Sequence, residues 1–363
     1  MNPNNFSIIM AGGIGARFWP MSRTDKPKQF IDICGTGETL IQRTVKRFER
    51  ICPTENIYIV TNEQYKELVL EQLPQLTEKQ IICEPFRRNT APCIAYANYK
   101  IRNLNPDANI VVAPSDHVIL NEDEFVRVVN IALDASAQTD ALFTLGINPS
   151  RPDTGYGYIQ FDELNPKDAE NKIYKVKTFT EKPVYEMALQ FLQSGDFLWN
   201  SGLFIWNLKA IDKAFRTFLP DIYELFDAGV QHINSRSEES FIRKTYEICK
   251  SISIDYGIME KAENVYVLAS DFGWSDLGTW GSLHDLRKKD EHNNAISGKN
   301  VKIYNTQNSI ISMPKDKLVV VQGLDDYIVV ENNNILLICK KQDEQLIRQF
   351  VNDVQADLGD KFV

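Results

Sequence analysis

Apolar residues in the first part of the chain follow two different spacings. Short continuous apolar runs, such as Ser7 to Met10 and residues 57–60, are typical of strands in a sheet covered on both faces. Between them, at residues 39–51 and 63–73, apolar positions recur at the three- and four-residue spacing of amphipathic helices. Strand followed by helix, repeated, predicts parallel strands with crossover helices, and ligands of such sheets bind beyond the carboxyl ends of the strands.

The strand and helix patterns continue for most of the chain and then change. Further strands are predicted at residues 109–113, 141–145, 173–179, 203–206 and 265–268, and further helices from about 91, at 124–137, 208–218 and 238–249. From about residue 293, short strand-like runs are separated by Asn, Asp and Gly, at 301–304, 309–312, 317–321, 327–330 and 335–339, with a helix at 343–354. We therefore predict a large α/β domain over residues 1–290 and a small β-rich domain over residues 291–363.

Composition narrows the class of partner. The chain has 363 residues, 43% of them hydrophobic and 25% charged, which is ordinary for a globular protein. Its net charge of -9 disfavours nonspecific binding to nucleic acid, so an anionic ligand needs a local basic site. None of the 6 cysteines forms a C-x-x-C pair, so neither a zinc site nor a disulfide framework is indicated. Without a signal-peptide pattern or a long apolar run, a cytoplasmic protein with no membrane partner is expected.

The segment after the first strand carries the clearest ligand-binding pattern. Gly12, Gly13 and Gly15 leave the backbone open, and N–H groups of such a turn can converge on an anion. Four cations follow closely: Arg17, Arg23, Lys26 and Lys28. The pattern predicts a site for the phosphates of a nucleotide, although an ordinary strand-to-helix turn is the alternative.

Two common nucleotide motifs are absent from this segment. A dinucleotide-binding Gly-x-Gly-x-x-Gly motif that starts at Gly13 requires a third glycine where Phe18 stands. A Walker motif requires Gly-Lys five residues after the first glycine, where Arg17 or Phe18 stands. A dehydrogenase or a P-loop enzyme is therefore disfavoured.

Two aspartates stand alone just after predicted strands. Asp116 follows the strand at 109–113, and Asp276 follows the strand at 265–268. Carboxylate oxygens favour Mg²⁺, so the pair predicts a magnesium site, although capping of a turn explains each residue singly.

Other polar segments have both a ligand-binding and a purely structural interpretation. Asn89 or Thr90 could cap the helix that begins near residue 91, or read the edge of a purine. Glu181 and Lys182 could hold a sugar hydroxyl and a phosphate, or form a surface turn. Asn200 could donate and accept toward a pair of hydroxyls.

Several of these segments resemble one enzyme family. The run from Gly12 to Arg17, followed by Pro27 to Gln29, resembles the signature of the sugar-nucleotide pyrophosphorylases, which join a nucleoside triphosphate to a sugar 1-phosphate. The run from Phe18 to Arg23 is most similar to the branch that uses GTP and mannose 1-phosphate. The resemblance implies a Rossmann-like nucleotidyltransferase (GT-A-like) fold, with a mixed sheet flanked by helices, plus a small C-terminal domain like a left-handed β-helix. It also implies GDP-mannose and pyrophosphate as products, Mg²⁺ as cofactor and a homodimer.

The same resemblance assigns roles to residues of this chain. It implies catalytic roles for Arg17 and Lys28 and metal-binding roles for Asp116 and Asp276. The nucleotide-binding candidates are Ala11, Gly12, Gly13, Gly15, Glu84, Pro85, Asn89 and Thr90. The sugar-phosphate-binding candidates are Gly157, Glu181, Lys182 and Asn200.

Two alternative functions stay open at this point. The same fold and reaction could use another pair, such as glucose 1-phosphate with UTP or dTTP. From a different class, the chain could be a non-catalytic sensor of sugar nucleotides. The presence of all four charged candidates, Arg17, Lys28, Asp116 and Asp276, argues against the sensor, because a silent protein has no need to keep them.

Overall fold

The computed structural model describes residues 1–363 and divides them into two compact units. The first, here the sheet unit, comprises Met1–Gly12, Thr44–Ser115 and Ile119–Trp274. The second, here the coil unit, comprises Gly13–Arg43, Asp116–Val118 and Ser275–Val363. No helix in either unit combines the length and apolar composition that crossing a membrane requires.

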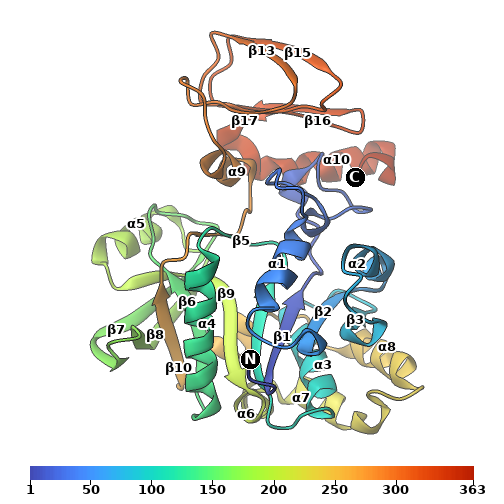
Figure 1. Ribbon diagram of the computed structural model, residues 1–363, viewed down its shortest axis with the longest axis vertical. Coiled ribbons are helices and arrows are strands. Elements are labelled where there is room, and N and C mark those ends of the chain that lie inside the picture. Colours follow the sequence, from blue (N-terminus) through green and yellow to red (C-terminus); the bar gives the residue numbers. More distant parts are fainter. The chain divides into compact units, whose positions relative to one another are not determined.

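A mixed nine-stranded sheet forms the centre of the sheet unit (Figure 1). Its strands are β1 (Asn5–Met10), β2 (Ile57–Asn62), β3 (Ile81–Glu84), β4 (Asn109–Pro114), β6 (Leu142–Ile147), β7 (Gly157–Asp168), β8 (Ile173–Glu181), β9 (Phe197–Asn207) and β10 (Val265–Ser270), in the order β3-β2-β1-β4-β9-β6-β10-β8-β7. Strands β1 to β4 are parallel, as the strand–helix repeat predicts. Strand β9 runs antiparallel to β4 and β6, which makes the sheet mixed.

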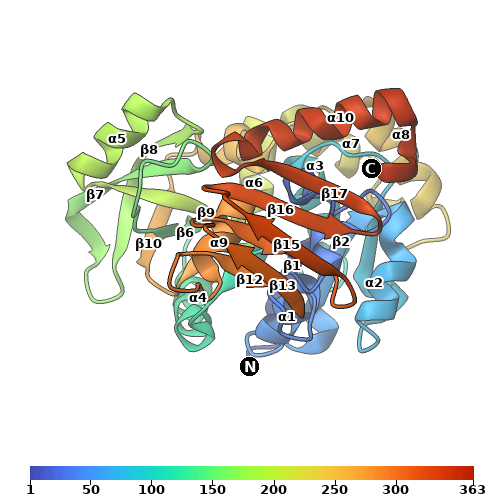
Figure 2. The same cartoon turned by 90° about the horizontal axis from the view of Figure 1, so that it is seen from above.

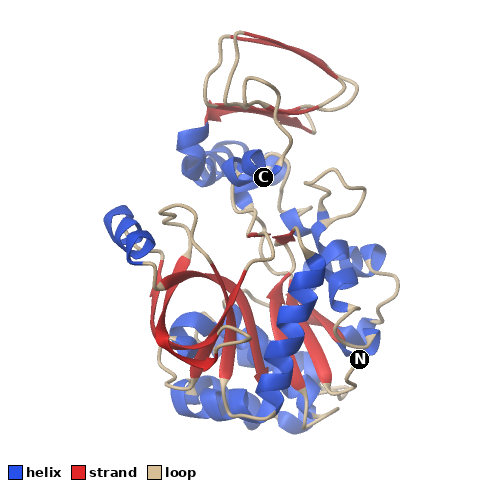
Figure 3. Ribbon diagram, turned by 60° about the vertical axis from the view of Figure 1, so that its left-hand side comes forward, coloured by secondary structure: helices blue, strands red, loops and turns tan.

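Helices cover both faces of this sheet, as Figure 3 shows in blue and red. They are α2 (Lys66–Gln72), α3 (Thr90–Arg102), α4 (Glu122–Ala137), α5 (Tyr185–Ser194), α6 (Leu208–Phe218), α7 (Pro220–Asp227) and α8 (Glu238–Ile248), and α1 (Leu40–Phe48) spans residues of both units. Alternate side chains of a strand point to opposite faces, so Phe6 and Ile8 of β1 pack in one core with α3, α6, α7 and α8. Helix α4 packs against β4, β6, β9 and β10.

Most predicted elements are present, and the differences are local. The predicted strands at 57–60, 109–113 and 141–145 and the helices at 124–137 and 208–218 are confirmed within a few residues. Strand β9 starts at Phe197, ahead of the predicted start at 203, because β7 and β6 both pair with this earlier part. Strands β3 and β7 and helices α5 and α7 were not predicted.

The coil unit is built from stacked parallel strands. Its strands are β12 (Ala295–Ser297), β13 (Asn300–Tyr304), β14 (Ile310–Ser312), β15 (Leu318–Gln322), β16 (Tyr327–Asn332) and β17 (Ile335–Lys340), with helices α9 (Trp280–Leu286) and α10 (Ile347–Leu358). Strands β12, β14 and β16 are parallel and β17 closes them antiparallel, while β13 and β15 form a separate parallel pair. Figure 2 shows α10 beside β17. Helix α10 begins four residues later than predicted, because a 3-10 turn, Lys341–Leu346, precedes it. The remaining two strands of the protein, β5 (Val118–Ile119) and β11 (Trp274–Ser275), are very short.

The core of the coil unit includes residues from the early part of the sequence. Phe18 and Trp280 are fully buried and their rings lie 5.1 Å apart, beside Ile310 and Ile328. The indole N–H of Trp19 donates to the carbonyl of Phe362 at 2.7 Å. Residues 13–43, which contain most of the glycine segment, are therefore held by α9 and by the C-terminal residues.

Candidate functional site

Gly15 and Lys28 lie against each other in the coil unit. Gly15 has a φ of 74°, in the left-handed region that glycine adopts without strain. A Cβ atom at this position would lie 2.6 Å from Cβ of Lys28, so only glycine fits. Lys28 begins a 3-10 turn, Lys28–Phe30, and its backbone N–H donates to the carbonyl of Ile14 at 3.1 Å. The glycine segment thus fixes the start of the Lys28 side chain.

The Lys28 ammonium group connects both predicted metal-binding segments. Its Nζ lies 2.7 Å from Asp116 Oδ2 and donates to the carbonyls of Asp276 and Leu277 at 2.9 and 2.8 Å. The side chain is only 4% exposed. Partial burial acts to raise the pKa of Asp116, but Lys28 and then His117 outweigh it, so the pKa is lowered and the carboxylate stays charged.

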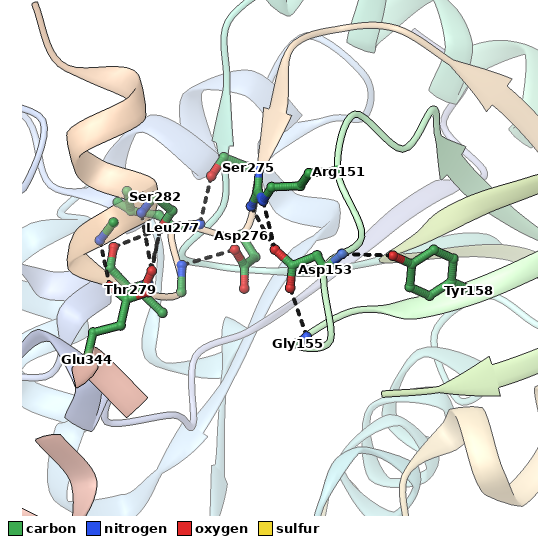
Figure 4. Close-up of polar contacts among 12 residues, drawn as sticks. Arg151, Asp153, Gly155, Tyr158, Ser275, Asp276, Leu277, Thr279, Ser282 and Glu344 are labelled. Carbon is green, nitrogen blue, oxygen red and sulfur yellow. Dashed lines mark hydrogen bonds and ion pairs between the residues drawn. The ribbon is translucent and has the colours of Figure 1, made fainter. Parts of the chain in front are cut away.

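The Asp276 segment is a tight turn held by its own hydrogen bonds (Figure 4). Asp276 Oδ1 accepts from the backbone N–H of Gly278 at 3.0 Å, and Ser275 Oγ accepts from that of Leu277 at 3.1 Å. Thr279 then caps α9 by accepting from Ser282 N at 3.2 Å. The turn holds the carboxylate close to its own backbone, and a side chain on Gly278 would overlap it.

The residues around Lys28 fit a magnesium ion that is shared with a ligand. Mg²⁺ in nucleotide sites takes one or two carboxylates and completes its shell with water and phosphate oxygens. Here Asp116 and the carbonyls at 276 and 277 already surround a cation, the Lys28 ammonium group. No group of three or more His, Cys, Asp or Glu side chains suits a metal held by protein alone. The metal roles of Asp116 and Asp276 stay predictions. Arg17, in the 3-10 turn Ala16–Phe18 of the same unit, is half-buried.

Glu84, at the end of β3 in the sheet unit, is a buried carboxyl group with a tyrosine partner. Tyr246 of α8 donates from its hydroxyl to Glu84 Oε1 at 3.0 Å. A Cβ on Gly12 would lie 3.8 Å from Glu84 Oε2, so this oxygen faces the first glycine of the loop. Burial raises the pKa of Glu84 to about 8, against the opposing effects of the Tyr246 hydrogen bond and the Arg87 charge. The group is therefore largely neutral at pH 7.

The other nucleotide-side candidates lie at the ends of helices and strands. Asn89 caps α3 with its side chain, accepting from Thr90 N at 2.9 Å, which confirms the capping interpretation for Asn89. Thr90 Oγ1 accepts from Ile254 N at 2.8 Å. Pro85 follows β3 directly, and Ala11 is buried after β1, where its N–H donates to Val60 O at 2.7 Å. These contacts are structural, and roles toward a base stay predictions.

Three of the four sugar-side candidates lie on three neighbouring strands of the sheet unit, and the fourth, Lys182, directly follows one of them. Gly157 of β7 pairs in register with Glu181 of β8, and the adjacent pair Tyr158–Trp199 places Asn200 of β9 beside them. A Cβ on Gly157 would overlap Glu181 Oε2 and lie 3.3 Å from Asn200 Cβ. Glycine at 157 is therefore required for the Glu181 carboxylate to occupy its place against the β7 backbone.

Lys182 adopts a backbone conformation that is unusual for its residue type. Its φ is 47°, in the left-handed region, and its N–H donates to Tyr156 O at 3.2 Å. The ammonium group pairs with Glu181, and the side chain is 58% exposed. Non-glycine residues held in this region often occur at ligand sites. The turn therefore places a largely exposed cation beside the carboxylate of Glu181, the last residue of β8.

The loop before β7 is ordered by Asp153 (Figure 4). Asp153 accepts from Arg151 Nε at 3.0 Å and from Gly155 N at 2.8 Å, and its own N–H donates to the Tyr158 hydroxyl at 3.0 Å. The loop therefore has a defined shape, and it ends where Gly157 begins β7.

The sequence pattern did not single out two residues that contact these groups. Tyr246 has the spacing of a core residue on α8, and nothing local indicates its bond to Glu84. Asp255 begins a π-helical turn, Asp255–Met259, and its Oδ1 accepts from Asn200 Nδ2 at 2.8 Å. The i to i+5 spacing of such a turn leaves no regular pattern of apolar residues in the sequence.

Comparison with known proteins agrees with this arrangement. A family model described as nucleotidyl transferase matches residues 6–293, and one described as MannoseP isomerase/GMP-like beta-helix domain matches residues 298–354. The chain is 36% identical to a mannose-1-phosphate guanylyltransferase of Klebsiella pneumoniae, over 95% of this chain and 72% of that protein. It is 34% identical to one of Escherichia coli K12, over 97% and 74%.

A solved structure extends the match to the fold. The crystal structure of a protein named mannose-1-phosphate geranyltransferase, from Thermus thermophilus, superposes with a TM-score of 0.85 at 28% identity, over 97% of this chain and 99% of that one. The predicted combination of a mixed α/β nucleotidyltransferase sheet with a small β-helix-like domain is thus confirmed. The chain belongs to the mannose-1-phosphate guanylyltransferase family of nucleotidyltransferases.

Proposed function

We propose that this protein transfers GMP from GTP to mannose 1-phosphate, giving GDP-mannose and pyrophosphate. An oxygen of the sugar phosphate forms a bond to the α-phosphorus of GTP. The bond between that phosphorus and the bridging oxygen to the β-phosphate breaks, and pyrophosphate leaves with the electron pair. The named activity of relatives that match nearly the whole chain supports this reaction.

The observation that carries the proposal is the meeting of Gly157, Glu181 and Asn200. The family resemblance selects them from three separate stretches of sequence, and they lie on adjacent strands with the glycine backbone against two polar side chains. Carboxylate and amide groups beside an exposed lysine suit the hydroxyls and phosphate of a sugar phosphate.

The reaction needs no general base from the protein. The second pKa of a phosphate monoester is about 6, so the attacking oxygen is already ionised at neutral pH. The remaining tasks are alignment of the reactants and stabilisation of charge on the leaving pyrophosphate. These tasks require cations and N–H donors.

The coil unit supplies the groups suited to phosphate. We assign the N–H groups of Gly13 and Gly15, with Arg17 and Lys28, to the triphosphate and the departing pyrophosphate. Asp116 and Asp276 would hold Mg²⁺, whose charge would neutralise phosphate oxygens when it is bound. Before ligand binds, the Lys28 ammonium group keeps Asp116 paired and ionised.

The sheet unit supplies the groups suited to the base and the sugar. We assign Glu84 to the guanine edge, supported by Pro85, Asn89 and Thr90 and by the backbone of Ala11 and Gly12. Lys182 would hold the sugar phosphate, with Glu181, Asn200 and the backbone of Gly157 around the ring. Tyr246 would orient Glu84 through their hydrogen bond.

The decisive experiment measures pyrophosphate release with magnesium across GTP, ATP, UTP and dTTP and a panel of hexose 1-phosphates. Release confined to GTP with mannose 1-phosphate is expected. Release with another pair would keep the reaction and overturn the assignment of base and sugar. Binding of GDP-mannose without release for any pair would favour the sensor.

We further propose that the protein is a homodimer. We also propose that residues 1–290 form the catalytic domain and residues 291–363 a small β domain. Leu336 and Ile338 of β17 are each 55% exposed, on a strand that pairs with β16 alone, and such apolar surface supports association. Light scattering is expected to give twice the 41.6 kDa chain mass, and a monomer at micromolar concentration would contradict it.

A further inference from the structure

The starting observation is that every polar atom of the Asn200 side chain but one N–H already has a partner. Oδ1 accepts from Gly202 N at 3.1 Å. The hydroxyl of Thr144 lies 3.4 Å from Oδ1, but its single hydrogen is donated to Leu203 O at 3.1 Å. Nδ2 donates one hydrogen to Asp255 Oδ1 at 2.8 Å. An amide nitrogen carries two hydrogens, so its second N–H is the group left for a ligand.

The hydrogen bond to Asp255 fixes the orientation of the Asn200 amide group. The carboxylate accepts only, so the nitrogen of Asn200 has to face it, and the reversed amide would bring two acceptors together. Hydrogen bonds to a charged acceptor are stronger than neutral ones, which holds the amide more firmly.

The segment that carries Asp255 is hydrogen-bonded to the start of α3, beside the candidates for base binding. Ile254 N donates to Thr90 Oγ1 at 2.8 Å, and Ala91 N donates to Ile252 O at 3.1 Å. Directly after these anchors the chain makes the π-helical turn Asp255–Met259, a form that occurs frequently at functional sites. Asp255 is therefore presented to Asn200 from a fixed backbone.

We propose that Asp255 is a positioning residue for the sugar phosphate. It holds the Asn200 amide so that Asn200 acts as a hydrogen-bond donor to an oxygen of mannose 1-phosphate. This inference rests on the proposed function, and it assigns a role to a residue outside the sites described above.

The charged groups around Asp255 supply a matched control. Glu181 and Glu260 both act electrostatically on Asp255, and Lys182 opposes them. Glu260 directly follows the π-helical turn Asp255–Met259, and it makes no hydrogen bond to Asn200. Removing its charge tests the local potential without disturbing the amide.

The test compares KM values for the two substrates in four variants. In Asp255→Leu the amide loses its acceptor, and KM for mannose 1-phosphate should rise about tenfold while KM for GTP stays within about twofold. Asp255→Asn keeps an acceptor oxygen and should recover most of the affinity. Glu260→Leu should leave both KM values close to wild type.

The exchanged pair Asn200→Asp/Asp255→Asn is the sharpest variant. It keeps a hydrogen bond between the two positions but removes the donor from position 200, so the melting temperature should recover while KM for mannose 1-phosphate stays high. Full recovery of KM in the exchanged pair would overturn the inference, as would an equal rise of both KM values in Asp255→Leu. If Asp255→Leu does not fold, Asp255→Asn and the exchanged pair still decide.

Failure of this inference is distinguishable from failure of the proposed function. A wild-type protein that releases pyrophosphate with GTP and mannose 1-phosphate, beside an Asp255→Leu variant with unchanged KM, would overturn only the role of Asp255. A wild-type protein that releases no pyrophosphate with any pair would overturn the function itself.

Discussion

Two carboxyl groups, one in each compact unit, have opposite electrostatic settings. Glu84 of the sheet unit is buried beside a tyrosine hydroxyl, and its pKa is raised to about 8. Asp116 of the coil unit is half-buried beside an ammonium group 2.7 Å away, and its pKa is lowered. Burial raises the pKa in both places, so the difference comes from the cation that only Asp116 contacts.

This difference matches two kinds of chemistry. A carboxylate that stays charged suits the magnesium-binding role proposed for Asp116. A carboxyl group near neutrality in an apolar setting is suited to hydrogen bonding with a neutral base. Four substitutions, in order of decreasing expected effect, change the surroundings of Glu84 or those of the charged group around Lys28.

Lys28→Ala should give the largest effect. It removes the charge partner of Asp116 and a proposed donor to the leaving pyrophosphate, so kcat should fall about 100-fold or more, roughly 3 kcal/mol. Steady-state kinetics with GTP and mannose 1-phosphate measures it. Lys315→Ala, at an exposed lysine of the same unit outside the glycine segment, is the control and should keep wild-type turnover. A normal kcat for Lys28→Ala would remove this residue from the mechanism.

Glu84→Gln should change how stability depends on pH. Between the ordinary pKa of 4.5 and the folded value of about 8, the folded protein keeps a proton that the unfolded chain has lost. The unfolding free energy of the wild type therefore falls as pH rises through this window, by roughly 2 kcal/mol between about pH 5 and 7 from this group. Urea denaturation should show a smaller fall in Glu84→Gln, whereas exposed Glu71→Gln should keep the wild-type slope. Equal slopes in all three would refute the raised pKa.

Asp276→Asn should raise the magnesium concentration needed for half-maximal activity, by about tenfold. A second readout is the magnesium-dependent increase in melting temperature with GTP present, which should need correspondingly more metal. Asp285→Asn, at an exposed acid of α9, should behave as wild type. An unchanged magnesium titration in Asp276→Asn would argue against a ligand role.

Tyr246→Phe should have the smallest effect. Loss of the bond to Glu84 should cost about 1 kcal/mol of unfolding free energy at about pH 6. The loss should grow near pH 9, where Glu84 is ionised and the bond is charge-assisted. A double-mutant cycle with Glu84→Gln isolates this coupling, and no coupling at either pH would contradict the assigned bond.

The sequence predicts those parts of the fold that depend on local periodicity. The helices at α4 and α6 and the strands at β2 and β4 have regular patterns, and their positions are confirmed. The stacked strands of the coil unit are also recovered, because each short apolar run is bounded by Asn, Asp or Gly.

Elements that depend on distant partners were missed. Strand β7 carries Gly157 and polar residues such as Gln160 and Asp162, and it is a strand because β8 and β9 pair with it. The early part of β9, with Asn200, is extended for the same reason. Neither pairing leaves a signal within one stretch of sequence.

The candidate site shows the same limit. Family resemblance selects Glu181 and Asn200, and both lie in one group. Asp255, the partner of Asn200, is positioned by an irregular helical turn. Tyr246 reaches its partner Glu84 across 162 residues of sequence. Side chains that orient other side chains are specified by tertiary packing, which motif spacing does not report.

The burial of Phe18 and Trp19 in the coil unit has a consequence for biosynthesis. Chains are made from the N-terminus, and early segments begin to fold first. Phe18 leaves the ribosome far ahead of Trp280, and Trp19 far ahead of Phe362, although each pair is in contact in the folded protein. The glycine segment thus stays without its packing partners through most of translation. A nascent chain therefore completes the fold of this segment late, and until then the segment lacks the contacts that bury Phe18 and Trp19.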